Sequence, residues 1–361
     1  MTCGLRGSSA TARSKTGRRT TTGCSRSARR RCGSCGGCWS CKRMGRNPLR
    51  TTNGKSSRTR ARRACGWAVT LAACLCLASA CSVKKFAVRQ VGDALAAGPS
   101  TFETDPDVDL VGDALPFSLK FVESLLEITP RHRGLLVTAA KGFALYALAY
   151  VDTPGEMLAD EDYLEGKRLR ERAKRLYLRS LAFSMRGLEA AYPGIAEEFR
   201  TSPGSAAGRV AKKHIDLLYW AGAALGLSIS ADPTDASMVV RLREVDAMLE
   251  RALELDETWD RGAFHEFRLS LESAKPGGGA ESVMEESYRR ALELSAGERA
   301  GLFVTYAEAR AIPEQDRALF DEMLNKALAV DPDAHEQYRL LNHLAQRRAR
   351  WLRSKVDDLF F

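Results

Sequence analysis

The sequence predicts an all-α fold, a solenoid of stacked helix hairpins, over residues 81–361. Apolar residues in this part recur at intervals of three and four, as at Leu242, Val245, Leu249 and Ala252, which is the spacing of a helix packed on one side. No long stretch alternates between apolar and polar residues, as a half-buried strand would. The chain is therefore expected to be helical and long enough here for a large core.

Three segments share one pattern and define the predicted hairpin unit. Residues 248–256, 287–295 and 323–331 each carry an alanine followed by a leucine and two further helix-forming residues. Their alanines, Ala252, Ala291 and Ala327, are separated by 39 and 36 residues, which is close to the ~34-residue period of tetratricopeptide repeats. We therefore expect a tetratricopeptide-like α-α superhelix. The alternative is ordinary helical packing in which similar strings recur by chance.

The ends of these segments carry residues that favour the start of another helix. Asp256, Ser295 and Asp331 each follow the pattern, and such side chains cap helix N-termini. Pro332 would then occupy a first-turn position, where its missing N–H is harmless. We expect each of the three polar residues to cap the helix that follows.

The N-terminal segment, residues 1–63, differs sharply from the rest. It holds 18 of the 55 Lys and Arg residues and no Asp or Glu, and it has too few apolar residues to fold. Beyond it, 37 basic side chains face 45 acidic ones, a net charge of −8. Residues 1–63 are expected to be disordered, and the folded part has no basic excess that would favour nucleic-acid binding.

Four closely spaced cysteines lie within this segment, at Cys32, Cys35, Cys38 and Cys41. Their spacing resembles that of iron–sulfur and zinc sites. However, the surrounding residues lack an apolar pattern that could build a shell around a metal. Because Met44 offers a start that gives an ordinary export leader, we expect residues 1–43 to lie upstream of the true start and predict no metal site.

The apolar region of the leader, residues 64–80, is shorter than the ~20 residues of a membrane-spanning helix and ends in small residues. It is predicted to be a cleaved signal peptide. The five residues ending at Cys81 resemble a bacterial lipobox, although Ala78 stands where leucine is usual. Residues 71–74 fit the lipobox better, but they would leave too short an apolar core before Cys74.

Cys81 is therefore the predicted lipid-attachment residue, with a soluble export signal or an uncleaved anchor as the alternatives. Two or more acyl chains hold a protein stably on a membrane, whereas one holds it only marginally. Ser82 rather than an aspartate follows the cysteine, which favours the outer membrane of a cell with two membranes. Since all ten cysteines lie at or before Cys81, the mature chain has no partner for a disulfide.

Candidate chemistry in residues 81–361 is sparse. The five histidines form no His-Glu-x-x-His string, and neither a Gly-x-Ser-x-Gly elbow nor a phosphate-binding glycine loop occurs. We predict no catalytic residue, no metal and no cofactor. Asp105, Asp107 and Asp109 resemble the start of a calcium-binding loop, but Leu110 replaces the turn glycine and Pro116 the final glutamate. This stretch is therefore expected to cap a helix before Val111.

Two stretches predict an apolar pocket with a polar mouth. Phe117, Lys120 and Glu123 follow one another at spacings of three on one side of a helix, and Phe143 and Tyr146 come from the next helix. These five residues are the candidate ligand-binding set. The alternative is an amphipathic core face with a Lys–Glu pair on the surface.

The same stretches carry a resemblance to a known family. The chain resembles the T-component (TatT) lipoproteins of TRAP transporters over essentially all residues from Cys81. The matching stretches are residues 109–120, 123–126, Pro130, 134–136, Phe143, 172–177, 186–188, 249–255, 262–267, 342–352 and 357–360.

This resemblance implies a periplasm-facing, lipid-anchored adaptor that binds the substrate-binding protein of a TRAP system and is not an enzyme. Family members have a pocket suited to an apolar ligand, and the five candidate residues match the family's marked stretch. Self-association remains open. The alternative function is a general tetratricopeptide scaffold lipoprotein for envelope assembly, whose groove holds a peptide segment.

Overall fold

The computed structural model describes residues 83–97, 100–275 and 278–361, all within one compact unit, Gly66–Phe361. The basic segment 1–63, the apolar region 64–80 and Cys81 lie outside the described residues, so what was predicted for them stays a prediction. Within the described ranges the chain is helical and contains no strand. The all-α prediction is confirmed.

The helices vary widely in length. The first covers residues 83–96. The long helices are α2 (Val108–Ile128), α3 (Arg133–Ala147), α5 (Tyr163–Ala191), α8 (Ile215–Ser230), α10 (Leu242–Asp256), α11 (Ala263–Ser273), α12 (Glu281–Ser295), α14 (Arg317–Ala329) and α15 (Arg339–Ser354). The short ones are α4 (Thr153–Leu158), α6 (Ile195–Thr201), α7 (Pro203–Arg209), α9 (Ala236–Val239), α13 (Ala300–Tyr306) and α16 (Val356–Leu359), and two π-helical turns cover Leu148–Asp152 and Ala307–Ala311.

Helices α2 and α3 begin the body of the protein. Asp107 accepts a hydrogen bond from the backbone N–H of Leu110 at 2.9 Å, which confirms the expected cap of α2. Leu119, Val122 and Leu126 follow at helical spacing and are buried together with α3 side chains. The run Arg133–Leu158, α3 and its continuation, has the length and composition to cross a membrane, but α3 packs between α2 and α5 as a core helix.

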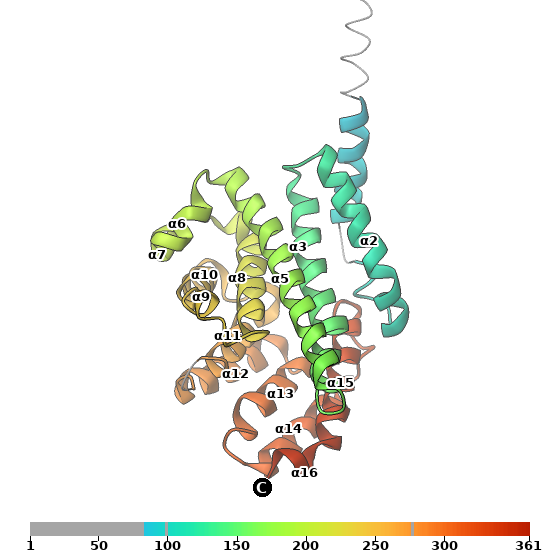
Figure 1. The fold of residues 1–361 in the computed structure, drawn as a ribbon, viewed down its shortest axis with the longest axis vertical. Helices are drawn as coiled ribbons and strands as arrows, with labels where there is room; N and C mark the ends of the chain where they lie inside the picture. Colours follow the sequence, from blue (N-terminus) through green and yellow to red (C-terminus); the bar gives the residue numbers. More distant parts are fainter. Residues whose placement is uncertain (1–82, 98–99, 276–277) are drawn as a thin grey trace, which may run out of the picture. The chain divides into compact units, whose positions relative to one another are not determined.

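Helix α8 occupies the centre of the largest apolar cluster. It packs against α5 on one side and α10 on the other, and it also contacts α3 (Figure 1). Leu217, Leu218 and Leu225 on α8 are fully buried, as is Phe264 at the start of α11. Its side chains are 0–7% exposed, so this cluster, which extends from Leu181 to Leu271, contributes strongly to apolar burial.

The three repeated segments form the C-terminal ends of α10, α12 and α14. Ala252, Ala291 and Ala327 are 1%, 3% and 0% exposed, so each lies where a neighbouring helix approaches closely. Helix α10 packs against α8, α12 against α11, and α14 against α13 and α15. The expected role of the alanines in helix pairing therefore agrees with the packing.

The predicted caps after these segments are wrong. Asp256 and Asp331 accept hydrogen bonds from the backbone N–H two residues ahead, at Thr258 (3.2 Å) and Asp333 (3.0 Å), and so make local turns. Extra turns then separate each segment from the next helix, whose capping positions are Gly262, Arg299 and Tyr338. Pro332 accordingly lies in a turn, because α15 begins only at Arg339.

The last long helix, α15, returns to the first part of the body. Its Leu340 N–H donates to the carbonyl of Glu103 at 3.1 Å, and Leu340 is buried with Val111 and Leu115 of α2. The remaining contacts are ionic or polar. We call the Leu340 contacts and these polar contacts together the closing seam. The polar pairs are Arg339–Thr104 (2.8 Å), Arg347–Asp109 (3.1 Å), Arg348–Glu156 (2.6 Å) and Lys355–Asp160 (2.9 Å).

Candidate functional site: a large cavity at the closing seam

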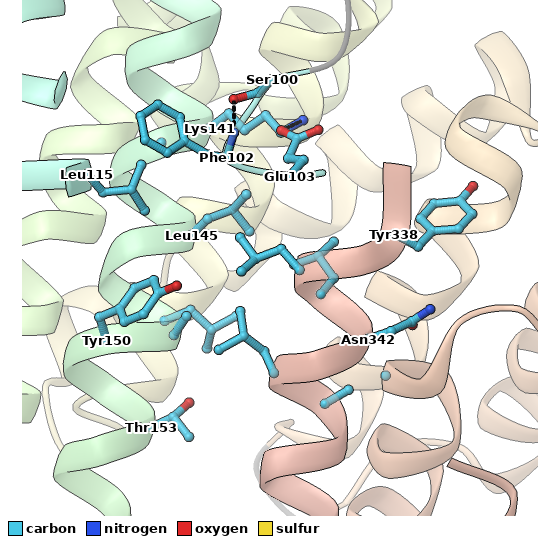
Figure 2. Close-up of a pocket in the computed structure, with 18 of the residues that line it drawn as sticks. Ser100, Phe102, Glu103, Leu115, Lys141, Leu145, Tyr150, Thr153, Tyr338 and Asn342 are labelled. Carbon is cyan, nitrogen blue, oxygen red and sulfur yellow. Dashed lines mark hydrogen bonds and ion pairs between the residues drawn. The ribbon is translucent and has the colours of Figure 1, made fainter. Parts of the chain in front are cut away.

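A cavity of about 1420 Å³ lies beside the closing seam. One wall is made by α2 and α3, another by α15, and the rest by the end of helix 83–96, α4, α11 and α13. Figure 2 shows Leu145 and Tyr150 projecting from one wall toward α15, which carries Asn342. The cavity therefore exists because residues far apart in the sequence meet at the seam.

Apolar side chains make up most of the lining. They include Leu115, Leu119, Leu145, Val304 and Leu344, which are supplied by helices from both ends of the chain. The cavity is larger than the 300–1,000 Å³ of an ordinary small-molecule site. It can hold a sizeable apolar molecule with a small number of polar contacts.

Tyr150 marks one end of the apolar wall. It lies in the π-helical turn Leu148–Asp152, and such turns often occur at functional sites. Its hydroxyl donates to the carbonyl of Val108 at 2.9 Å, which ties α2 to the end of α3. Burial and the neighbouring carboxylate of Asp109 raise the pKa of Tyr150 to about 12, so the hydroxyl stays protonated at neutral pH.

Two ion pairs lie at separate points of the lining. Lys141 pairs with Glu103, and Arg299 pairs with Glu266 at 3.0 Å. The guanidinium of Arg299 also lies 5.4 Å from the ring centroid of Tyr338, close enough for a cation–π contact. These polar groups interrupt the apolar wall and could orient the polar end of a bound molecule.

A third charged group joins the cavity to the seam. The Arg348 guanidinium contacts Glu308 at 2.7 Å and Glu156 at 2.6 Å and lies 4.4 Å from the ring centroid of Trp351. Glu308 comes from the second π-helical turn, Ala307–Ala311. Burial raises the pKa of the Glu308 carboxyl, and the nearby Arg348 opposes that rise.

Of the five predicted pocket residues, Phe117 is the one that lines the cavity. Its side chain is 78% exposed, which is unusual for a phenylalanine and places it at the cavity's edge. Lys120 and Glu123 lie on the same helix and pair with each other at 2.6 Å, and Glu123 also accepts from Arg179 at 2.5 Å. Neither residue lines the cavity, and the Glu123 side chain, 12% exposed, connects α2 to α5.

Phe143 and Tyr146 lie within the packing behind the cavity wall. Phe143 is 4% exposed and stacks on Phe183, with ring centroids 5.7 Å apart. Tyr146 stacks in the same way on Tyr150, at 5.8 Å, and so supports a residue that does line the cavity. Their part in ligand binding stays a prediction.

Sequence reasoning missed the C-terminal half of the lining. Tyr338, Asn342 and Arg348 reach the cavity only because α15 packs back on α2, and no local motif records that contact. Arg347 and Arg348 lie near Trp351, and nothing in their sequence neighbourhood indicates which acidic residues they meet. Within the described ranges, no group of three or more His, Cys, Asp or Glu side chains could hold a metal ion.

Comparison with known proteins agrees with this architecture. The TRAP transporter T-component family matches residues 104–360. An uncharacterized protein of Treponema pallidum (strain Nichols) is 31% identical over 310 residues, which cover 80% of this chain and 95% of that protein. The family match extends from Thr104 in the closing seam to the end of α16 and so includes most of the residues that line the cavity. The chain therefore belongs to the T-component family of TRAP transporters.

Proposed function

We propose that this protein is a lipid-anchored adaptor of a TRAP-type transport system, held by Cys81 on the periplasmic side of the outer membrane. In this role it binds the substrate-binding protein of the system and holds a small apolar ligand in its cavity. The family match over residues 104–360 carries the proposal. A role in transport rather than catalysis is also proposed, and the same family match supports it.

The cavity lining supports the ligand part of the proposal. Leu115, Leu145 and Leu344 give it an apolar surface, while the pairs Lys141–Glu103 and Arg299–Glu266 supply polar points. An apolar molecule gains about 25 cal/mol for each Å² it removes from water. A chain-like molecule that fills the cavity would therefore bind tightly without any fixed charge.

Phe117 is the predicted residue best placed to touch such a ligand. The other four, Lys120, Glu123, Phe143 and Tyr146, are proposed to support the wall, through the ion pair on α2 and the aromatic stacks behind α3. Replacing Phe117 by alanine would then weaken ligand binding more than replacing Lys120 by alanine.

The partner is tested by capture of a TRAP substrate-binding protein from the same organism. Purified adaptor, immobilised through its lipid end in a nanodisc, is expected to retain that protein and not a binding protein of another transporter class. If neither is retained, while peptides from envelope proteins bind instead, the general scaffold becomes the better account.

The ligand is tested by solvent extraction of the purified protein followed by mass spectrometry. Ala345 lines the cavity on α15, and the Ala345→Trp variant should exclude the ligand by filling part of the space. Ala318→Trp is the matched control, because Ala318 is exposed on α14 and outside the lining. An apolar compound should extract from the control and from the unmodified protein, but not from Ala345→Trp. Equal amounts from all three would refute a ligand in this cavity.

A further inference from the structure

The exposed apolar side chains are concentrated in one part of the surface. Of the twelve large apolar side chains that are exposed among the described residues, seven lie on helix 83–96 and α2. Such concentrations on a soluble protein mark contact surfaces. The seven are Val83, Phe86, Val91, Leu95, Leu110, Phe117 and Phe121.

Close contacts with the body fix which face of helix 83–96 points outward. Val88 packs against the core of α2 and α3, and Gly92 lies so close to α3 that an added Cβ would be 3.0 Å from Leu135. One turn later, a Cβ on Gly134 would lie 2.5 Å from that of Ala96. Residues 88, 92 and 96 share one helix face, so the opposite face is directed away from the body.

That opposite face is apolar and has a basic border. Val83, Phe86 and Val91 on it are 66%, 63% and 44% exposed. Lys84, next to Val91 around the helix, and Arg89, next to Phe86, are both exposed at the edges of this face. The only acidic residue of the helix, Asp93, lies 3.2 Å from the ring of His132. An apolar stripe flanked by lysine and arginine is the pattern of a helix that lies in the interface of a membrane with anionic lipids.

The position of the helix relative to the predicted anchor limits what can cover this face. Helix 83–96 begins two residues after Cys81, and two residues span at most about 7 Å. If Cys81 carries acyl chains, as the proposed function assumes, Val83 and Phe86 must lie next to the bilayer surface. In Figure 1 the helix, drawn in blue, extends beyond the connection between α2 and α3, so its first turns are free to meet that surface.

We propose that helix 83–96 docks on the anionic lipid surface of the membrane to which the protein is anchored. The Val83–Phe86–Val91 face enters the boundary between headgroups and acyl chains, and Lys84 and Arg89 at its edges contact lipid headgroups. The apolar surface continues to Leu95, Phe117 and Phe121, all of which line the cavity. Docking therefore brings the edge of the cavity to the bilayer, where an apolar ligand can exchange between lipid and cavity with little exposure to water.

The insertion is tested with a tryptophan reporter in lipidated full-length protein, reconstituted in vesicles whose acyl chains carry bromine, a short-range quencher. Phe86→Trp places the reporter on the docking face, and Leu164→Trp is the matched control, because Leu164 is 76% exposed at the start of α5. After subtraction of the native tryptophan signal, the Phe86→Trp reporter should lose at least half its emission and the control almost none. Equal quenching of the two reporters would overturn the proposal.

The charge requirement is tested with the Lys84→Gln, Arg89→Gln double variant on vesicles with and without phosphatidylglycerol. Each basic side chain near an anionic surface contributes about fivefold in binding, so the double variant should bind about 25-fold more weakly, and only where the anionic lipid is present. A loss that is independent of lipid charge would contradict the proposal. Sedimentation of Phe86→Asp gives a second test. If the unmodified protein is an oligomer and Phe86→Asp is a monomer, this face binds a second copy of the chain, and the proposal is contradicted.

These readouts separate the helix from the adaptor role. The intact mass of membrane-extracted protein reports whether Cys81 carries lipid, and capture of the binding protein reports the adaptor function. Quenching of the Phe86→Trp reporter measures only whether this helix meets lipid. A protein that captures its partner but shows no quenching would refute membrane docking and leave the proposed function standing.

Discussion

The core around α8 and the closing seam hold the protein together by different means. Around α8, leucine, phenylalanine and alanine side chains from α5, α8 and α10 exclude water almost completely. At the seam, the buried apolar cluster is small: Val111, Leu115 and Leu340, with partly buried side chains packed around them. Most other contacts are ion pairs with exposed partners such as Asp109. Exposed ion pairs contribute little, about 0–1 kcal/mol each.

This difference suggests how the cavity could open. A break in the core would expose a large apolar area and unfold the protein, whereas a break in the seam would expose much less. Since α15 forms one wall of the cavity, movement at the seam would admit a ligand while the core stays folded. If the cavity holds a ligand, as proposed, the seam is therefore the place where local opening would let it in.

The largest effect is expected from truncation in the core. Phe264 is fully buried, with 0% of its surface accessible, and its ring centroid lies 5.1 Å from that of Trp259 and 5.5 Å from that of Tyr219. Phe264→Ala should lower the free energy of unfolding by about 4 kcal/mol, measured by urea titration. Phe86→Ala, at a 63% exposed site, should change it by less than about 0.5 kcal/mol. Similar losses of unfolding free energy in Phe264→Ala and Phe86→Ala would show that the core around α8 contributes no more to stability than an exposed site.

A smaller and more local effect is expected at the seam. Arg348→Met leaves the carboxylates of Glu308 and Glu156 without their shared partner. Because the Glu308 side chain keeps 34% exposure, toward the cavity, the cost should be about 2 kcal/mol rather than the 3–5 of a fully buried pair. Hydrogen exchange should quicken in α15 and residues 103–109 while amides of α8 stay protected.

The Arg348→Met, Glu308→Gln double variant is the control for this experiment. It removes the carboxylate that would otherwise lack a partner, so most of the lost stability should return. If α8 and α15 exchange faster by the same factor in Arg348→Met, the seam does not open independently of the core.

The elements were easier to predict than the site. Spacing at Leu242, Val245 and Leu249 predicts α10, and Asp107 predicts the start of α2, because helix periodicity and capping act within a few residues. Ala252, Ala291 and Ala327 also identify the close helix contacts. These signals are local, so one sequence contains them in full.

The site could be predicted only in part because it depends on contacts between the two ends of the chain. Phe117 stands at the cavity edge, as its position before a polar pair indicates, but Tyr338 and Arg348 enter the lining from more than 200 residues away. The failed caps at Asp256 and Asp331 have a related cause. The path of the chain to the next helix is set by tertiary packing, and extra turns intervene that the repeat pattern does not contain.

The smallest expected effect is a difference in pH dependence between the two regions. In the first half, the Lys174 ammonium, followed by the Ser237 hydroxyl, lowers the pKa of Asp235 to about 2. Its contribution to stability is complete above pH about 4 and is lost as pH falls toward 2, because the unfolded state then binds more protons. At the seam, burial raises the pKa of Glu308. The ionised carboxylate therefore destabilises the folded state at a pH above that raised pKa. Acidification toward pH about 4 protonates the carboxyl in both states and removes this cost.

The two carboxyls should therefore give slopes of opposite sign in urea titrations across pH 2–8. Relative to Asp235→Asn, the unmodified protein should lose stability below pH about 4, and relative to Glu308→Gln it should gain stability as pH falls from 7 toward 4. Slopes of the same sign would mean that the Glu308 carboxyl is stabilised in its charged form by Arg348. The seam would then be a strong ionic lock, and the cavity would need a partner rather than thermal motion to open it.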